Sequence, residues 1–592
     1  MNKLFSLHAA RGSALMATLV VALLSPGTDS VRAAHPSAPK LLPDTTLVYA
    51  RIADSRDLVE RFQQTAFGRL FKDPQVEPLV SQLYGSASQL FMKAQQRIGL
   101  SLDQLLAIPQ GEVCFAVVGR PEGKPAVVVM LEVGEKADSA GKLVEFIEGR
   151  MIARGVTRRS EHVGDTTVIE LENRFSYCLR DGVYLFCNNT DLLKAMLKVW
   201  DGDPNVKTLA DNPNFTAIMR QSVGTRNERP QVTWFVDPIE LFRNLTRDNI
   251  GAQMALAMLP ALGLDGVKAA GGSIILATEQ FDSISYMHVL LDNPRAGVLK
   301  MIAIEPGDQT PEDWVPYDAA SYMNIYWNSE KTLTAFRQLY NTIRNRDHAL
   351  SEDIESQLSK PLGIDFEKDV LQQLDNRFTY VTWIEKPARI NSGTSLFGIK
   401  VKNAEAIRKT ITKLANRFPD RFEKKRFSGT TYYKIVPRRK AKVVDKELVR
   451  QAQPCLCVLG DYVLFSDSIK CLEAAISNKK DPSKSLATEL EFKLIASKAK
   501  QYLGADKPGA MIFSRPEEAM RSFYELATSP TTRQRLADAA QRNPVFRELD
   551  QALRDHPLPP FAVIAKYLTP SGGTLVSDQS GLHYMAFALK RE

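Results

Sequence analysis

The stretch that decides the fold is GDTTVIELE at residues 164–172, continued by FSYCLRDGVYLFCNNTDLLKAML at residues 175–197. A related stretch occurs later in the chain, as SGTTYYKIV at residues 428–436 and PCLCVLGDYVLFSDSIKCLEAAI at residues 454–476. Both copies alternate short apolar runs with turn residues, which is typical of β-strands joined by tight turns. The repetition indicates that the chain is built from two related units.

A two-residue turn stands at the same point of each copy. Asp181-Gly182 in the first copy suits a type I′ turn, and Gly460-Asp461 in the second suits a type II′ turn. Each turn predicts a β-hairpin with a fixed register. The pairs expected in the first hairpin are Leu179 with Tyr184 and Tyr177 with Phe186 on one face, and Cys178 with Leu185 on the other.

Both faces of the first hairpin are apolar, so we expect it to be buried on both sides. A helix expected at residues 190–199 can cover one face. Its apolar stripe of Leu192, Leu193, Met196 and Leu197 recurs in the second copy as Cys471, Leu472 and Ile476. Before the hairpin, an amphipathic helix is expected at residues 137–153, with Leu143, Phe146, Ile147 and Met151 pointing inward.

The order of elements repeats along the chain. Gly271-Gly272 recurs as Gly572-Gly573, and Tyr286-Met287 recurs as Tyr584-Met585. Runs of adjacent antiparallel strands between helices indicate the α+β class. We therefore predict two tandem, internally duplicated modules of antiparallel sheet with packed helices. The expected divisions are a signal peptide at 1–33, a linker at 34–43, a first module at 44–301, a linker at 302–315 and a second module at 316–592.

The N-terminus has the pattern of an export signal. Lys3 and Arg11 precede an apolar run of 11 residues, Ala14 to Leu24, which is too short to span a bilayer comfortably. Small residues at Val31 and Ala33 predict cleavage after Ala33. We expect a periplasmic or extracellular protein with no transmembrane span after cleavage; the alternative is an uncleaved anchor helix.

The composition is that of a globular protein. The chain has 592 residues, of which 44% are hydrophobic and 24% charged, and its mean hydropathy of −0.20 excludes a polytopic membrane protein. The net charge is +8, and much of it lies in Pro437 to Gln453, which has six basic and two acidic residues. Because the rest is nearly balanced, we expect no nucleic-acid partner. We expect a solvated loop at this basic segment, with a partner-binding patch as the alternative.

The cysteines, histidines and motifs indicate no recognisable chemistry. We expect the six cysteines to be buried free thiols, not disulfides or zinc ligands. The usual nucleophile, metal and phosphate motifs are missing, and His288 and His583 do not occupy equivalent positions in the two copies. We therefore name no catalytic, cofactor-binding or metal residue and leave enzymatic activity uncertain, leaning towards none.

One apolar segment of the first copy has a polar counterpart in the second. Met254 to Leu264 reads MALAMLPALGL, where the second copy has the polar sequence TTRQRLADAAQRN. A stripe rich in methionine and leucine is more often core than a binding lip, so we expect it in the core.

The opening of the mature chain has an element of the form T-x-x-G-R-L-F-x-D-P. It consists of Thr65, Gly68, Arg69, Leu70, Phe71, Asp73 and Pro74. With the preceding LLPDTTLVYARI, it resembles a set of exported, uncharacterised bacterial proteins, best known from planctomycetes, that carry a domain of unknown function. The resemblance implies export and no established activity. For the element itself we expect structural roles: Gly68 relieves a close helix contact, and Asp73-Pro74 starts the next helix.

Together these features predict an exported cell-envelope protein with a non-catalytic binding or structural role. One alternative is a carrier of an apolar ligand or lipid, which predicts a large apolar cavity in the first module only, with Met254 to Leu264 as its lip. The other alternative is a periplasmic hydrolase, which predicts two close carboxylates in a cleft, or a histidine within reach of a serine or cysteine.

Overall fold

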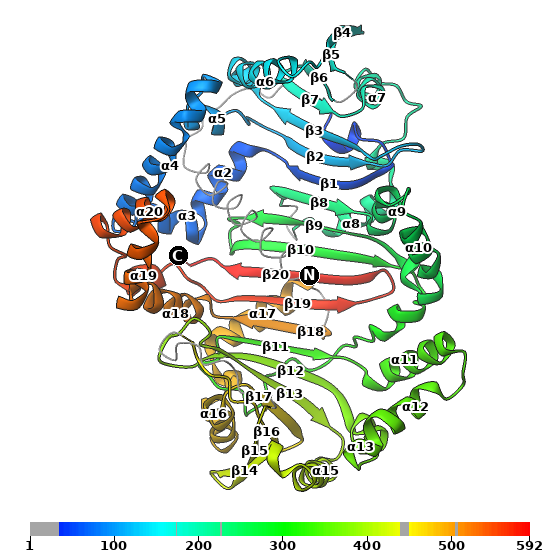
Figure 1. The fold of residues 1–592 in the computed structure, drawn as a ribbon, viewed down its shortest axis with the longest axis vertical. Coiled ribbons are helices and arrows are strands. Elements are labelled where there is room, and N and C mark those ends of the chain that lie inside the picture. Colours follow the sequence, from blue (N-terminus) through cyan, green and yellow to red (C-terminus); the bar gives the residue numbers. More distant parts are fainter. Residues whose placement is uncertain (1–34, 173–174, 225–227, 438–448, 504–506, 592) are drawn as a thin grey trace.

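The computed structural model describes residues 35–591 except 173–174, 225–227, 438–448 and 504–506. The predicted signal peptide therefore lies outside the described residues. Within them, twenty strands form one continuous antiparallel sheet with helices packed around it (Figure 1). This confirms the α+β class. We refer to residues 35–301 as the first half and to residues 302–591 as the second half.

The strands of the first half follow the order β4-β5-β6-β7-β3-β2-β1-β8-β9-β10, all antiparallel. Their bounds are β1 Thr46–Ile52, β2 Val113–Val118, β3 Ala126–Glu132, β4 Arg158–Val163, β5 Thr166–Leu171, β6 Phe175–Arg180, β7 Val183–Cys187, β8 Val232–Val236, β9 Val267–Leu276 and β10 Phe281–Leu291. The helices are α2 Ser55–Gln64, α3 Ala66–Phe71, α4 Glu77–Ile98, α5 Leu102–Leu106, α6 Ala137–Ile152, α7 Thr190–Trp200, α8 Pro213–Gln221, α9 Pro238–Leu245 and α10 Ile250–Leu262.

The strands of the second half follow the corresponding order, β14-β15-β16-β17-β13-β12-β11-β18-β19-β20. Their bounds are β11 Ser321–Tyr326, β12 Leu374–Ile384, β13 Gly393–Val401, β14 Phe422–Phe427, β15 Thr430–Ile435, β16 Cys455–Leu459, β17 Tyr462–Ser466, β18 Ala510–Ser514, β19 Ser571–Ser577 and β20 Gly581–Leu589. The helices are α11 Ser329–Arg344, α12 Ala349–Ile354, α13 Lys360–Leu362, α14 Phe366–Asp369, α15 Ala404–Arg417, α16 Ile469–Lys480, α17 Leu490–Leu503, α18 Pro516–Thr528, α19 Pro530–Ala540, α20 Pro544–Asp555 and α21 Phe561–Ala565. That the two halves descend from one duplicated unit stays a prediction.

Within the sheet, the halves join through one strand pair, β10 with β20, at its centre (Figure 1). The Tyr-Met dipeptide that recurs in the sequence lies at the middle of this junction. Tyr286 is opposite Met585, and Met287 is opposite Tyr584. Because corresponding strands pair antiparallel, the junction has the form of an isologous dimer interface within one chain. β4 and β14 are left at the two outer edges of the sheet.

The two hairpins have the turns and register expected of them. Asp181 and Gly182 both have positive φ, as a type I′ turn requires, whereas in the second turn only Gly460 does, as in type II′. The three predicted pairs in the first hairpin are confirmed. α7 packs on the face with Cys178 and Leu185, in the main first-half core. All six cysteines are buried and unpaired, and burial raises the pKa of the Cys187 thiol to about 11.

The recurring glycine pairs are explained by close packing. A Cβ atom on Gly271 would lie 2.9 Å from Cγ2 of Ile218 on α8. A Cβ atom on Gly572 would lie 2.2 Å from Cγ2 of Ile495 on α17. In each half a helix thus touches the sheet where only glycine leaves room for it.

The apolar segment 254–264 is not core, so that prediction is wrong. Ile250 on α10 is 80% exposed and Met254 is 67% exposed, while Leu256 is the buried residue of the helix. α10 contacts α9 and the chain near residue 300, and most of its surface faces solvent.

Three other expected surface segments contribute buried residues. Leu41 and Leu42, in the expected linker 34–43, lie in the first-half core, and Trp314, in the expected linker 302–315, lies in the second-half core. Residues 438–448 of the basic segment 437–453 lie outside the described residues. Its Arg450 is buried and pairs with Asp467, unlike a fully solvated loop.

The element around Gly68 connects the two halves. A Cβ atom on Gly68 would lie 2.1 Å from the carbonyl oxygen of Phe62, which confirms its role at a close helix contact. Arg69 donates to the carbonyl of Arg591 at 2.9 Å, at the far end of the chain. Asp73 does not start the next helix, because α4 begins at Glu77; that prediction is wrong.

Asp73 instead holds the second half. Its side chain is buried, and its Oδ2 lies 2.5 Å from Nζ of Lys566 and accepts from the Tyr567 hydroxyl at 2.8 Å. Oδ1 accepts from the backbone N–H of Gln75 at 2.9 Å. These donors, Lys566 above all, lower the pKa of Asp73 from 3.8 to about 2.

Replacing Asp73 by Asn removes the charge and keeps the shape. Because the pKa of Asp73 is lowered in the folded state, the carboxylate stabilises the fold above pH 3.8 and loses this effect as the pH falls towards 2. We expect D73N to have a lower Tm than the wild type at pH 7, with the difference vanishing near pH 2, by calorimetry. D248N, at an exposed aspartate, is the control; equal Tm values for the two variants at pH 7 would contradict the role of Asp73.

Candidate functional site

The strongest candidate site is an apolar cavity of about 280 Å³ in the first half. It lies between α6 and the strands β3, β5, β6 and β7. Its lining consists of Ile108, Val129, Leu131, Ala140, Leu143, Val144, Ile147, Glu148, Leu171, Phe175, Tyr177, Tyr184 and Phe186. Twelve of these thirteen residues are apolar or aromatic, which is the usual character of a small-molecule site.

Four aromatic rings form the sheet side of the cavity. Tyr184 and Phe186 stack with ring centroids 5.4 Å apart, and Phe175 stacks on Phe186 at 5.7 Å. Tyr177 lies beside both Phe175 and Phe186. Side chains two apart on a strand point to the same face, so the predicted hairpin register brings these rings together.

The helix side of the cavity includes Leu143 and Ile147, two of the residues expected on the inward face of α6. The buried residues of α6 are Ala140 and Val144, and Ile147 is 44% exposed. Small residues explain the space: Ala140 lines the cavity, and Gly141 lies over Tyr184, where a Cβ atom would be 3.8 Å from the phenol oxygen. A helix that presents small residues to large rings leaves volume between them.

A single charged group lies at the edge of the cavity. Glu148 accepts a hydrogen bond from the Tyr177 hydroxyl, and its Oε1 lies 2.5 Å from Nε of Arg158. Burial raises the pKa of Tyr177 well above its ordinary value, and the bond to Glu148 raises it further. The phenol therefore remains a donor, and the carboxylate is satisfied by groups of the protein itself.

This cavity can hold a ligand and exclude water, but its lining offers no nucleophile and no pair of an acid and a base. Among the described residues, no group of three or more histidine, cysteine, aspartate or glutamate side chains is arranged to hold a metal ion. The chemistry of the lining suits an apolar group.

The corresponding place in the second half has fewer aromatic rings. In the matched hairpin, Leu456 and Val463 stand where the first half has Tyr177 and Tyr184. The apolar-carrier hypothesis predicted a large apolar cavity in the first half alone; the second half also has a cavity here, with Arg408 and Lys424 in its lining. Its expected lip is wrong, because no residue of 254–264 lines the cavity.

Two histidines meet at the junction, although their positions in the two copies do not correspond. His288 and His583 are opposite each other on β10 and β20, with their Nδ1 atoms 2.9 Å apart. His288 Nε2 lies 3.0 Å from the carbonyl of Gln221, so Nε2 carries the proton and Nδ1 accepts from His583. Burial, with the nearby His583, lowers the pKa of His288 to about 4. The pair is a buried polar link between the halves.

A serine lies within reach of this pair, as the hydrolase hypothesis required. Ser580 Oγ is 2.9 Å from Nε2 of His583. However, the same Nε2 lies 3.0 Å from Oδ1 of Asp578, which also accepts from the Ser580 hydroxyl at 2.7 Å. In a triad the acid holds the other ring nitrogen of the base. Here the Asp578 carboxylate accepts hydrogen bonds from groups of the β19–β20 turn, among them the backbone N–H groups of Ser580 and Gly581. This is the arrangement of a carboxylate that stabilises a turn.

Comparison with known proteins adds one family match. A family model described as a protein of unknown function (DUF3352) matches residues 307–543, less than half of the chain. No curated protein and no solved structure is significantly similar to the chain. The match supports a domain of unknown function, in the second half; the bacterial group named by the resemblance of the first half stays a prediction. Along the described residues, no helix combines the length and apolar character that crossing a bilayer requires.

The Tyr177–Glu148 bond can be tested with a matched pair of variants. Y177F removes a buried hydrogen bond to a charged acceptor and should lower the free energy of unfolding by about 1.5–3 kcal/mol. Y184F removes a hydroxyl that lies in the same cavity and makes no hydrogen bond with the described residues. It should change the free energy of unfolding by less than about 0.5 kcal/mol. Urea denaturation measures both; equal losses would contradict the assignment.

Proposed function

We propose that the protein is an exported, non-catalytic binding protein of the cell envelope that holds an apolar ligand in the cavity under α6. The observation that carries this proposal is the cavity lining, which is apolar except for one carboxylate already satisfied by Tyr177 and Arg158. A ligand with a charged group would find no free partner inside, so affinity has to come from burial of apolar surface.

The volume limits the ligand. An apolar cavity of about 150 Å³ binds benzene, so about 280 Å³ has room for a two-ring compound or for part of an alkyl chain. The three stacked rings of Phe175, Tyr184 and Phe186 favour a flat or aromatic group against the sheet side, since aromatic faces pack on one another. A whole lipid would need to leave most of its length outside, past the half-exposed Ile147.

Export fits the binding of an apolar ligand, because a protein in the envelope meets apolar compounds that are scarce in water. Export itself is proposed from the basic, apolar and small-residue pattern of residues 1–33.

The export prediction is checked by protein sequencing. Expressed with its full leader in a Gram-negative host, the protein should appear outside the cytoplasm with a mature N-terminus at Ala34. Replacing Ala33 by Leu should block processing and leave the precursor in the membrane fraction. An intact leader on soluble cytoplasmic protein would overturn the export proposal.

The ligand proposal is tested with a cavity-filling variant and a matched control. Val129 lines the cavity, whereas Val127, two residues earlier on the same face of β3, does not. We expect V129F to weaken binding of the neutral fluorophore N-phenyl-1-naphthylamine at least tenfold, because the new ring occupies the space. V127F should bind like the wild type.

Thermal melts of both variants show whether they fold. If folded V129F binds the fluorophore as well as V127F does, the ligand does not occupy this cavity and the proposal fails. Extraction of the mature protein from its own envelope, followed by mass spectrometry, would then identify what it does carry.

A further inference from the structure

A second cavity lies at the corresponding place in the second half, between α15 and the strands β14, β15 and β16, and its volume is about 460 Å³. α15 follows β13 as α6 follows β3, so the two cavities are matched in position along the fold. They lie at opposite ends of the sheet, as the positions of α6 and α15 in Figure 1 show. The two can therefore be filled independently.

The walls of this cavity carry hydrogen-bond donors where the first cavity carries rings. Arg408 and Lys424 supply two cations, and the lining contains no acidic residue. Four hydroxyl groups accompany them, on Thr412, Thr430, Thr431 and Tyr433. The Thr412 hydroxyl donates to the carbonyl of Arg408 at 2.8 Å, so it faces a ligand as an acceptor. The hydroxyls of Thr412 and Tyr433 lie 3.3 Å apart, which brings the helix and the sheet side of the cavity together.

The two cations are held loosely by the protein. Lys424 makes no ion pair within the described residues. The closest carboxylate to Arg408 is that of Glu405, at 3.5 Å, and its second contact is a long one to the carbonyl of Gly460, at 3.4 Å. Both side chains thus keep donors for a ligand.

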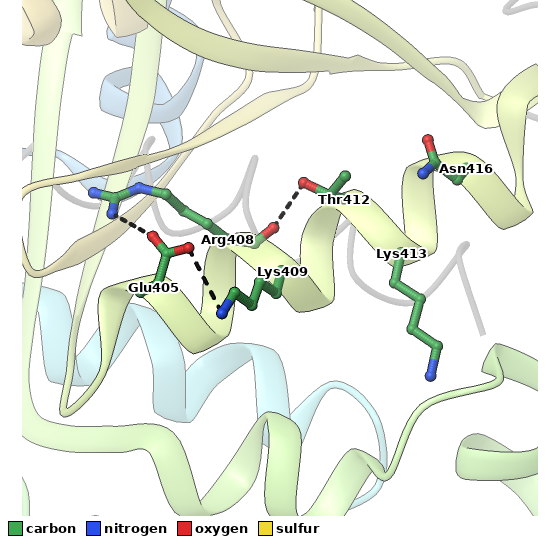
Figure 2. Close-up of a pocket in the computed structure, with 6 residues that line it drawn as sticks. All are labelled: Glu405, Arg408, Lys409, Thr412, Lys413 and Asn416. Carbon is green, nitrogen blue, oxygen red and sulfur yellow. Dashed lines mark hydrogen bonds and ion pairs between the residues drawn. The ribbon is translucent and has the colours of Figure 1, made fainter.

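α15 presents these groups on one side. Figure 2 shows Arg408 and Thr412 projecting to the same side of the helix, whereas Lys413 projects to the other, and Glu405 contacts Arg408 and Lys409. The same figure shows that the six polar residues on this exposed surface come from a single helix. The cavity proper needs the strands as well, because Lys424 comes from β14 and Tyr433 from β15.

The charge around this cavity differs from that of its counterpart. α15 and β14 together carry seven basic and two acidic side chains, whereas α6 and β4 carry four of each. The positive excess is therefore a property of the second half and not a general feature of this position in the fold. A positive field from several side chains favours a multiply charged anion.

We propose that the cavity under α15 binds a phosphate-bearing ligand. A phosphate monoester has several acceptor oxygens and up to two negative charges, and guanidinium, ammonium and hydroxyl donors from three elements converge on one space. The source is either a free phosphorylated compound or the phosphate of a lipid headgroup. This site is separate from the apolar cavity and does not depend on the function proposed for it.

The test compares two neighbouring lysines of β14 in the mature protein. Successive side chains on a strand point to opposite faces, so Lys424 faces the cavity and Lys425 faces away from it, beside Glu423. Binding of inorganic phosphate is measured by calorimetry in a phosphate-free buffer, with sodium chloride at matched ionic strength as the blank. We expect saturable binding that K424Q weakens about fivefold and K425Q by less than twofold.

The other outcomes decide the source or overturn the proposal. Sedimentation with vesicles that contain phosphatidic acid, weakened by K424Q and not by K425Q, identifies a lipid headgroup; phosphate binding without vesicle binding identifies a soluble compound. The absence of saturable phosphate binding, or an equal loss in K424Q and K425Q, would show a general charge effect and sink the proposal. V129F, in the other cavity, should bind phosphate like the wild type.

Discussion

The structure depends on the backbone pairing of β10 with β20. Each half ends in a strand that is apolar and long, and these two strands satisfy each other's hydrogen-bonding groups. The core follows the same continuity, because Ile275, Phe281 and Ile284 of the first half pack in the core of the second. The strands left at the outer edges are β4 and β14, which carry three and four charged side chains among their six residues each. Charge at an open edge discourages further strand pairing.

The sequence could predict those features of the fold that residues close together in the chain determine. The turn residues at 181–182 and 460–461 select a turn type, the turn fixes the register, and the register fixes which side chains share a face. The aromatic side of the first cavity follows from this chain of local effects, since Tyr177 and Phe186 are paired through the turn. The cavity itself did not follow, because it depends on how closely α6, with Ala140 and Gly141, approaches those rings.

The junction and its histidines could not be predicted for a different reason. Matching the two halves at a constant offset pairs His288 with Ala586, whereas the antiparallel junction places His288 opposite His583. At the centre of the junction, Tyr286 and Met287 lie opposite the recurring Tyr-Met dipeptide of the other half. Farther from the centre, a residue lies opposite one that does not correspond to it in the repeat, so comparing the two copies does not reveal the contact. Asp73 was misjudged similarly: its partners, Lys566 and Tyr567, are almost 500 residues away in the sequence.

The central pair also limits how many such halves can join in the same way. The strand by which each half joins the other is already paired with its counterpart. The outer strands β4 and β14 carry several charged side chains, which disfavour a further strand beside them. Because a junction of corresponding strands uses the same surface of both partners, it closes with two and leaves no copy of that surface open.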